Sequence, residues 1–102
     1  MLLLGQLALK QAGRANAPLR AWLDRWIEAV READWNSLQD VREAYPSADA
    51  VKLNSGLVVT IFNVKGNTFR LLADIHYDVQ TVEVLEVLTH AEYDKERWKT
   101  RY

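Results

Sequence analysis

Hydrophobic positions divide the chain into a helical first half and a strand-rich second half. A helix is expected to start at residue 17, because Asn16 is a typical helix cap and Pro18 suits a first helical turn. The spacing that follows predicts an amphipathic helix over residues 17–33, with both of its tryptophans in the core. The apolar positions recur three and four residues apart, as on one buried helix face: Leu19, Trp22, Leu23, Trp26, Ile27 and Val30.

Shorter elements surround this helix. The apolar run at residues 1–4 predicts a first strand that Gly5 ends, and residues 6–13 predict a short helix. Residues 37–44 predict another short helix, which Pro46 ends because proline disfavours a helical conformation in the residue before it.

The second half of the chain predicts strands. Residues 57–64 are β-branched and apolar, as in an internal strand, and residues 50–53 begin a strand before them. Residues 69–76 alternate between the two faces of a predicted strand. One face is expected to lie in the core, and the other face is more polar and carries Arg70, Leu72, Asp74 and His76. A last strand is expected over residues 82–88. The whole chain, residues 1–102, therefore predicts a single α+β domain, with helices on a small, mostly antiparallel sheet.

A short C-terminal helix is expected over residues 90–99. Thr89 and Glu92 form a capping-box pattern, which places the helix start directly after the last strand. In a continuous helix His90, Tyr93, Asp94 and Arg97 would share one face, because residues three and four apart are neighbours. Trp98 would lie on the adjacent face and anchor the helix in a core.

Composition restricts the possible chemistry. The chain has 102 residues and no cysteine, which excludes a thiolate nucleophile and cysteine-ligated metal. No metalloprotease, nucleophile-elbow or P-loop motif is present, so we expect no metal or other cofactor. The apolar opening is too short for a signal peptide or a membrane span, which favours the cytoplasm. The net charge of −1 offers no general attraction to nucleic acid, although residues 95–102 carry four cations against Glu96 alone.

Four polar side chains are candidates for chemistry. Arg70 and His76 fall on the polar side of one predicted strand, and His90 and Tyr93 lie just beyond the next, so antiparallel pairing could bring them together. A guanidinium, imidazoles and a phenol can neutralise phosphate charge and move protons. Structural roles explain the same residues, for example an ordinary ion pair between Arg70 and Asp74.

Three motifs, in this order, resemble the HigB family of type II toxins: Tyr45-Pro46-Ser47-Ala48-Asp49, Phe62-Asn63-Val64-Lys65-Gly66-Asn67-Thr68-Phe69-Arg70-Leu71 and Leu88-Thr89-His90-Ala91-Glu92-Tyr93-Asp94-Lys95. The resemblance runs from about residue 22 to residue 98. It implies a RelE-like fold, with helices on one face of the sheet and RNA bound on the opposite, concave face. It also implies ribosome-dependent cleavage of translated mRNA, and neutralisation by a HigA-type helix-turn-helix antitoxin.

The resemblance also implies a mechanism and residues for it. In RelE-like enzymes the 2′-hydroxyl of the RNA attacks the adjacent phosphate, so neither a metal nor a protein nucleophile is required. Arg70 belongs to the family's Gly-Asn-x-x-Arg pattern and is expected at the scissile phosphate. His90 and Tyr93 belong to its Thr-His-x-x-Tyr-Asp pattern, and one of them is expected to serve proton transfer, either directly or by positioning.

Further residues are expected to contact RNA. Asn67 and Asp94 match the same two patterns, although Asn67 could serve the turn alone. Lys65, His76 and Lys95 are secondary candidates for phosphate or base contacts.

Two departures from the family bear on activity. Lys65 stands where many relatives have glycine and adds a cation, whereas Leu85 stands where many have a basic residue. Leu85 and the neutral net charge favour a non-catalytic module of the same fold that binds RNA or the antitoxin. The intact arginine, histidine and tyrosine favour the enzyme. A metal-independent ribonuclease acting on free RNA is a third, remoter possibility.

Overall fold

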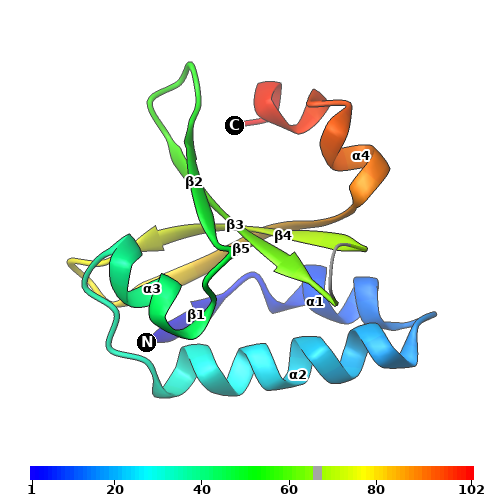
Figure 1. Cartoon of the computed structure of the whole chain (residues 1–102), viewed down its shortest axis with the longest axis horizontal. Helices are drawn as coiled ribbons and strands as arrows, with labels where there is room; N and C mark the ends of the chain where they lie inside the picture. Colours follow the sequence, from blue (N-terminus) through cyan, green and yellow to red (C-terminus); the bar gives the residue numbers. More distant parts are fainter. Residues whose placement is uncertain (66–67) are drawn as a thin grey trace.

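The protein consists of a five-stranded sheet with three helices on one face and a short C-terminal helix and turn on the other (Figure 1). A computed structural model describes residues 1–65 and 68–102. The expected α+β architecture is confirmed. Its elements are β1 (Leu2–Leu4), α1 (Gln6–Gly13), α2 (Ala17–Glu32), α3 (Leu38–Ala44), β2 (Asp49–Lys52), β3 (Val58–Val64), β4 (Phe69–His76), β5 (Thr81–Thr89), α4 (His90–Asp94) and the 3-10 helix η1 (Arg97–Thr100).

The sheet has the strand order β1-β5-β4-β3-β2, and every pairing is antiparallel except that of β1 with β5. The beginning of β4 therefore lies beside the end of β5, where Phe69 pairs with Thr89 and Arg70 with Leu88. Because α4 follows β5 directly, this register places its first turn next to Arg70.

The main core lies between the sheet and α1, α2 and α3. The side chain of Asn16 accepts a hydrogen bond from the backbone of Leu19 at 2.9 Å, which confirms the expected cap of α2. Trp26 is fully buried, with its ring 5.4 Å from that of Phe62 in an edge-on arrangement. Trp22 is only half-buried and lies beside Tyr45. The prediction that both tryptophans lie in the core is therefore fully confirmed for Trp26 and only partly for Trp22.

A second, smaller core covers the opposite face of the sheet. The prediction that this face of β4 is polar was wrong for its first half, because the C-terminal segment packs over it. Leu72 is completely buried and Arg70 is 8% exposed, whereas Asp74 and His76 at the other end remain more accessible. The buried members of this core are Leu53, Val59, Ile61, Leu72, Leu88 and Trp98.

The C-terminal helix is shorter than expected. The capping box of Thr89 and Glu92 is confirmed, but α4 ends at Asp94 and Glu96 adopts a left-handed conformation with φ 60°. This residue redirects the chain, so that Trp98 turns back beneath α4 and is 1% exposed. Trp98 is the anchor that the sequence predicted. Arg97, however, does not continue the helical face that begins at His90.

Among the described residues, two glycines have the positive φ angles that the turns require. Gly5, at the start of α1, has φ 79°, and a Cβ atom there would lie 2.4 Å from the carbonyl oxygen of Val84. Gly56, in the turn before β3, has φ 92° and open space around it. The turn expected at Lys65-Gly66-Asn67 falls partly outside the described residues. Among the residues that are described, no helix is both long and apolar enough to cross a membrane.

Candidate active site

Arg70 and Tyr93 meet at the end of the sheet where α4 begins. The guanidinium carbon of Arg70 lies 5.4 Å from the centre of the Tyr93 ring, which is a cation–π arrangement. Nη1 of Arg70 also donates a hydrogen bond to the carbonyl of Phe69 at 3.1 Å. The contacts keep a positive charge in a mostly dry position, where its interaction with a phosphate group would be stronger than in water.

Trp98 also packs against the Tyr93 ring. The Tyr93 and Trp98 rings are stacked, with centroids 5.4 Å apart and planes inclined by 15°. The indole N–H of Trp98 donates to the backbone carbonyl of Tyr93 at 3.1 Å. Arg70 and Trp98 therefore both contact the Tyr93 ring, and we name these three residues the Arg70 stack. Burial raises the pKa of the Tyr93 phenol above its ordinary value, although Arg70 acts in the opposite direction, so the phenol keeps its proton at neutral pH.

His90 is oriented by Asp94. Its Nδ1 lies 2.7 Å from a carboxylate oxygen of Asp94, and both side chains are partly exposed. The backbone N–H of His90 donates to the carbonyl of Thr68 at 3.0 Å, which ties the start of α4 to the beginning of β4. Since Nδ1 faces Asp94, Nε2 is the imidazole nitrogen left to meet a substrate. His90 and Tyr93 are three residues apart in α4 and so project from neighbouring positions on one side of it.

The other predicted contact residues are spread more widely. Lys65 is exposed at the end of β3, at the same end of the sheet as α4, and Lys95 is exposed directly after α4. Asn67 lies outside the described residues. His76 lies at the far end of β4, six residues from Arg70 or roughly 20 Å along a strand, and its imidazole is 3.1 Å from the carboxylate of Asp74. The structure thus brings Arg70, His90, Tyr93 and Asp94 together and leaves His76 apart.

Sequence reasoning missed the group that fixes the C-terminal segment to the sheet. Arg101 donates two hydrogen bonds to the carboxylate of Glu86 in β5, at 3.0 and 2.9 Å, and the hydroxyl of Tyr102 donates to the same carboxylate at 2.7 Å. Burial and this carboxylate raise the pKa of the Tyr102 phenol. Glu86 and Arg101 are fifteen positions apart in the sequence, so no local pattern could have indicated the pair.

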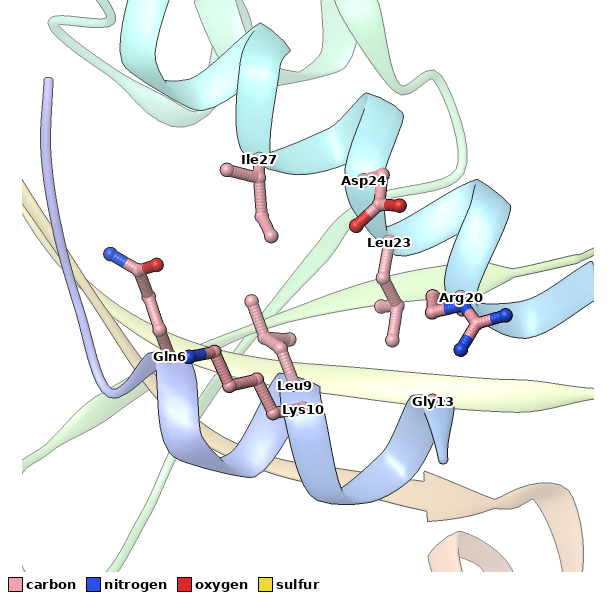
Figure 2. Close-up of a pocket in the computed structure, with 8 residues that line it drawn as sticks. All are labelled: Gln6, Leu9, Lys10, Gly13, Arg20, Leu23, Asp24 and Ile27. Carbon is pink, nitrogen blue, oxygen red and sulfur yellow. The ribbon is translucent and has the colours of Figure 1, made fainter. Parts of the chain in front are cut away.

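A hollow on the other side of the sheet is separate from this site. It lies between α1 and α2, where Leu9 of α1 and Ile27 of α2 point toward each other, with charged side chains around them (Figure 2). In the part of the chain that the structure describes, no three histidine, aspartate or glutamate side chains gather as a metal site would require.

Comparisons with known proteins define the class. Residues 19–96 match a family described as the RelE-like toxic component of a toxin-antitoxin system, HigB_toxin. The α+β fold, with α4 on the sheet face opposite α1 and α2, agrees with the RelE-like architecture expected from the sequence.

Curated relatives agree with this class. The chain is 30% identical over 94 residues to the mRNA interferase toxin HigB of Escherichia coli strain K12, an alignment that spans 92% of this chain and 88% of that protein. It is 33% identical over 73 residues to the mRNA interferase HigB of E. coli O6:H1 strain CFT073, which spans 72% of this chain and 66% of the relative. The mRNA interferase HigB of Shigella flexneri is 30% identical over 94 residues. The chain belongs to the HigB family of toxins.

Proposed function

We propose that this protein is an mRNA endonuclease that cleaves translated messages on the ribosome and is neutralised by a HigA-type helix-turn-helix antitoxin. The relatives that align over most of the chain are named mRNA interferases. The observation that carries the proposal is the meeting of Arg70, Tyr93 and His90 at one end of the sheet, where a cation, a phenol and an imidazole can act on one phosphate. An enzyme that acts on ribosomes would work in the cytoplasm.

The proposed reaction uses a nucleophile that belongs to the RNA. The 2′-oxygen attacks the adjacent phosphorus and the bond from phosphorus to the 5′-oxygen breaks, which leaves a 2′,3′-cyclic phosphate and a 5′-hydroxyl. One proton leaves the 2′-hydroxyl, and one proton is added to the departing 5′-oxygen. The protein must therefore align the attack, neutralise charge on the phosphorane and handle two protons.

The geometry supports a division of these tasks. Arg70, held in place by the Arg70 stack, would neutralise the phosphorane. His90, whose Nδ1 faces Asp94, would accept the proton of the 2′-hydroxyl at Nε2. Tyr93, whose raised pKa keeps the phenol protonated, would donate a hydrogen bond or proton to the leaving oxygen. This assignment separates the base from the acid, which the sequence left open.

The remaining predicted residues would contact RNA outside the scissile phosphate. Lys65 and Lys95 flank α4 and the adjoining end of the sheet, and Asp94 would act by orienting His90. The roles of Asn67 and His76 stay predictions, and His76 could reach only a more distant part of the RNA.

Expression in bacteria tests the proposal. Wild-type protein should arrest growth and produce in-frame cuts with 5′-hydroxyl ends in a translated message. Arg70→Ala and His90→Ala should each lower the cleavage rate about 100- to 1,000-fold, as for loss of one charge-stabilising or proton-transferring group. Lys10→Ala, on α1 across the sheet, is the matched control, and circular dichroism of each purified variant checks the fold. Normal growth and intact message with the wild-type protein would refute the proposal.

Two observations favour a second candidate function, a non-catalytic module that binds RNA or the antitoxin. Arg70 is only 8% exposed, and Leu85, at a position where the family resemblance led us to expect a basic residue, packs against the second core. A cleavage assay with purified protein, translating ribosomes and free RNA separates the possibilities. Binding without any cut supports the module, and equal cleavage of free and ribosome-bound RNA would support a general ribonuclease.

A further inference from the structure

A pocket of about 180 Å³ lies beside α4 and is lined by Glu92, Lys95, Arg97 and Arg101. We name these four residues the C-terminal cationic pocket. Within α4, Glu92 is two residues from both His90 and Asp94 and therefore projects to the opposite side of the helix. The pocket is thus a separate place from the imidazole of His90, about one helix width away, or roughly 10–12 Å.

Both carboxylates at this pocket, those of Glu92 and Glu86, already accept hydrogen bonds within the protein. The carboxylate of Glu92 accepts a hydrogen bond from the backbone N–H of Thr89 at 3.0 Å, which completes the capping box. Arg101 is paired with Glu86 through two hydrogen bonds. Each of these carboxylates therefore has a fixed structural partner at the edge of the pocket.

Lys95 and Arg97 differ from the other cations of the C-terminal segment. Among residues 1–65 and 68–102, no carboxylate lies within ion-pair distance of either side chain, whereas Lys99 is paired with Glu96 at 2.9 Å. Glu86 offsets the charge of Arg101, and Lys95 and Arg97 outweigh Glu92, so the pocket keeps one excess positive charge in a chain whose net charge is −1. The pocket is therefore suited to an anion.

The chemistry of the lining favours RNA over a protein segment. Four charged side chains surround the pocket, with no aromatic or aliphatic anchor of the kind on which protein interfaces depend. Arginine and lysine are the usual partners of phosphate oxygens. A single RNA strand bound at Arg70 is long enough to reach the pocket, because the two places are about one helix width apart.

We propose that Lys95 and Arg97 form a second phosphate-binding site, which holds the backbone of single-stranded RNA beside the candidate active site, next to Arg101 in its ion pair with Glu86. The inference rests on the proposed function and extends it, because only Lys95 was predicted from the sequence to contact RNA. Residues 97–102 also lie outside the part of the chain that matches the family.

Binding of an RNA that cannot be cleaved tests this site independently of catalysis. The probe is a fluorescein-labelled single-stranded RNA with a 2′-O-methyl group on every nucleotide, and its affinity is measured by fluorescence anisotropy between 50 and 200 mM salt. Arg97→Gln and Lys95→Gln should each weaken binding roughly tenfold at low salt. Each should also reduce the slope of log affinity against log salt by about 0.7, the value for one phosphate contact on a single strand. Lys99→Gln removes the same charge from the same segment and is the matched control.

The outcomes separate this inference from the proposed nuclease. If Lys99→Gln changes affinity and slope as much as Arg97→Gln does, or if the wild-type protein does not bind the probe, the second site is refuted. If Arg97→Gln and Lys95→Gln weaken capture of the antitoxin but not of RNA, the pocket belongs to a protein interface and the inference is wrong. If the wild-type protein binds the probe through these residues yet never cuts a message, the nuclease fails and the second site stands.

Discussion

Replacement of Trp98 by phenylalanine is the sharpest test of how the site is supported. The indole is 1% exposed and donates a hydrogen bond of 3.1 Å to the carbonyl of Tyr93. Phenylalanine keeps an aromatic ring for the stack but removes this donor and part of the buried ring. A net hydrogen bond contributes about 1 kcal/mol, and the small void adds a comparable cost.

The chain contains a matched control for this change. Trp26 is also fully buried, but its indole N–H has no hydrogen-bond partner among the described residues. Trp26→Phe leaves a similar void and at the same time removes a buried donor whose lack of a partner costs about 1–3 kcal/mol. We therefore expect Trp98→Phe to lower the free energy of unfolding by about 2 kcal/mol and Trp26→Phe by about 1 kcal/mol or less.

Thermal unfolding and cleavage together decide the outcome. For a domain of this size, 1 kcal/mol corresponds to about 4–8 °C in Tm, so Trp98→Phe should melt roughly 8–16 °C below the wild type. At a temperature where both variants are folded, only Trp98→Phe should cleave RNA more slowly, because of the two tryptophans only Trp98 contacts Tyr93. Equal melting temperatures for the two variants would refute the hydrogen-bond argument. Equal cleavage rates would refute the positioning role.

Three further predictions concern single residues. Gly5→Ala should destabilise the fold by about 3 kcal/mol or more because its Cβ would strike the carbonyl oxygen of Val84, whereas Gly56→Ala should cost only about 1 kcal/mol, and similar melting temperatures would contradict this. The hydrogen bond from the backbone of Thr89 lowers the pKa of Glu92 in the folded protein. The ionised Glu92 should therefore stabilise the fold fully above about pH 4.3, and this stabilisation should disappear as the pH falls through the pKa of Glu92 in the folded state. Glu92→Gln should therefore have a lower Tm than the wild type at pH 7 and the same Tm as the wild type at pH 2–3. Tyr93→Phe should lower the cleavage rate at least tenfold with little change in Tm, and an unchanged rate would exclude a role for the phenol.

The local elements of this protein follow from short-range patterns. The apolar stripe of α2, the cap at Asn16 and the capping box at Thr89 depend on residues that are close in sequence, so their geometry follows from helical spacing alone. The strands from β3 to β5 follow in the same way from runs of β-branched and alternating residues. The family resemblance rested on three local motifs, and the match over residues 19–96 agrees with it.

Long-range packing decided how the candidate site is built. The antiparallel register of β4 and β5 set Arg70 beside α4 and left His76 at the other end of the sheet. Helical spacing predicted one face for His90 and Arg97, but the left-handed turn at Glu96 separated them.

What the sequence by itself determined is therefore the kind of element at each position and the kind of chemistry its residues can perform. Only the tertiary structure decided that Trp98 stacks beneath Tyr93, that Glu86 holds Arg101, and that Lys95 and Arg97 surround a common pocket. The physical reason is that contacts between distant segments depend on how the chain closes over the sheet. A periodic pattern within one helix or strand carries no information about that closure.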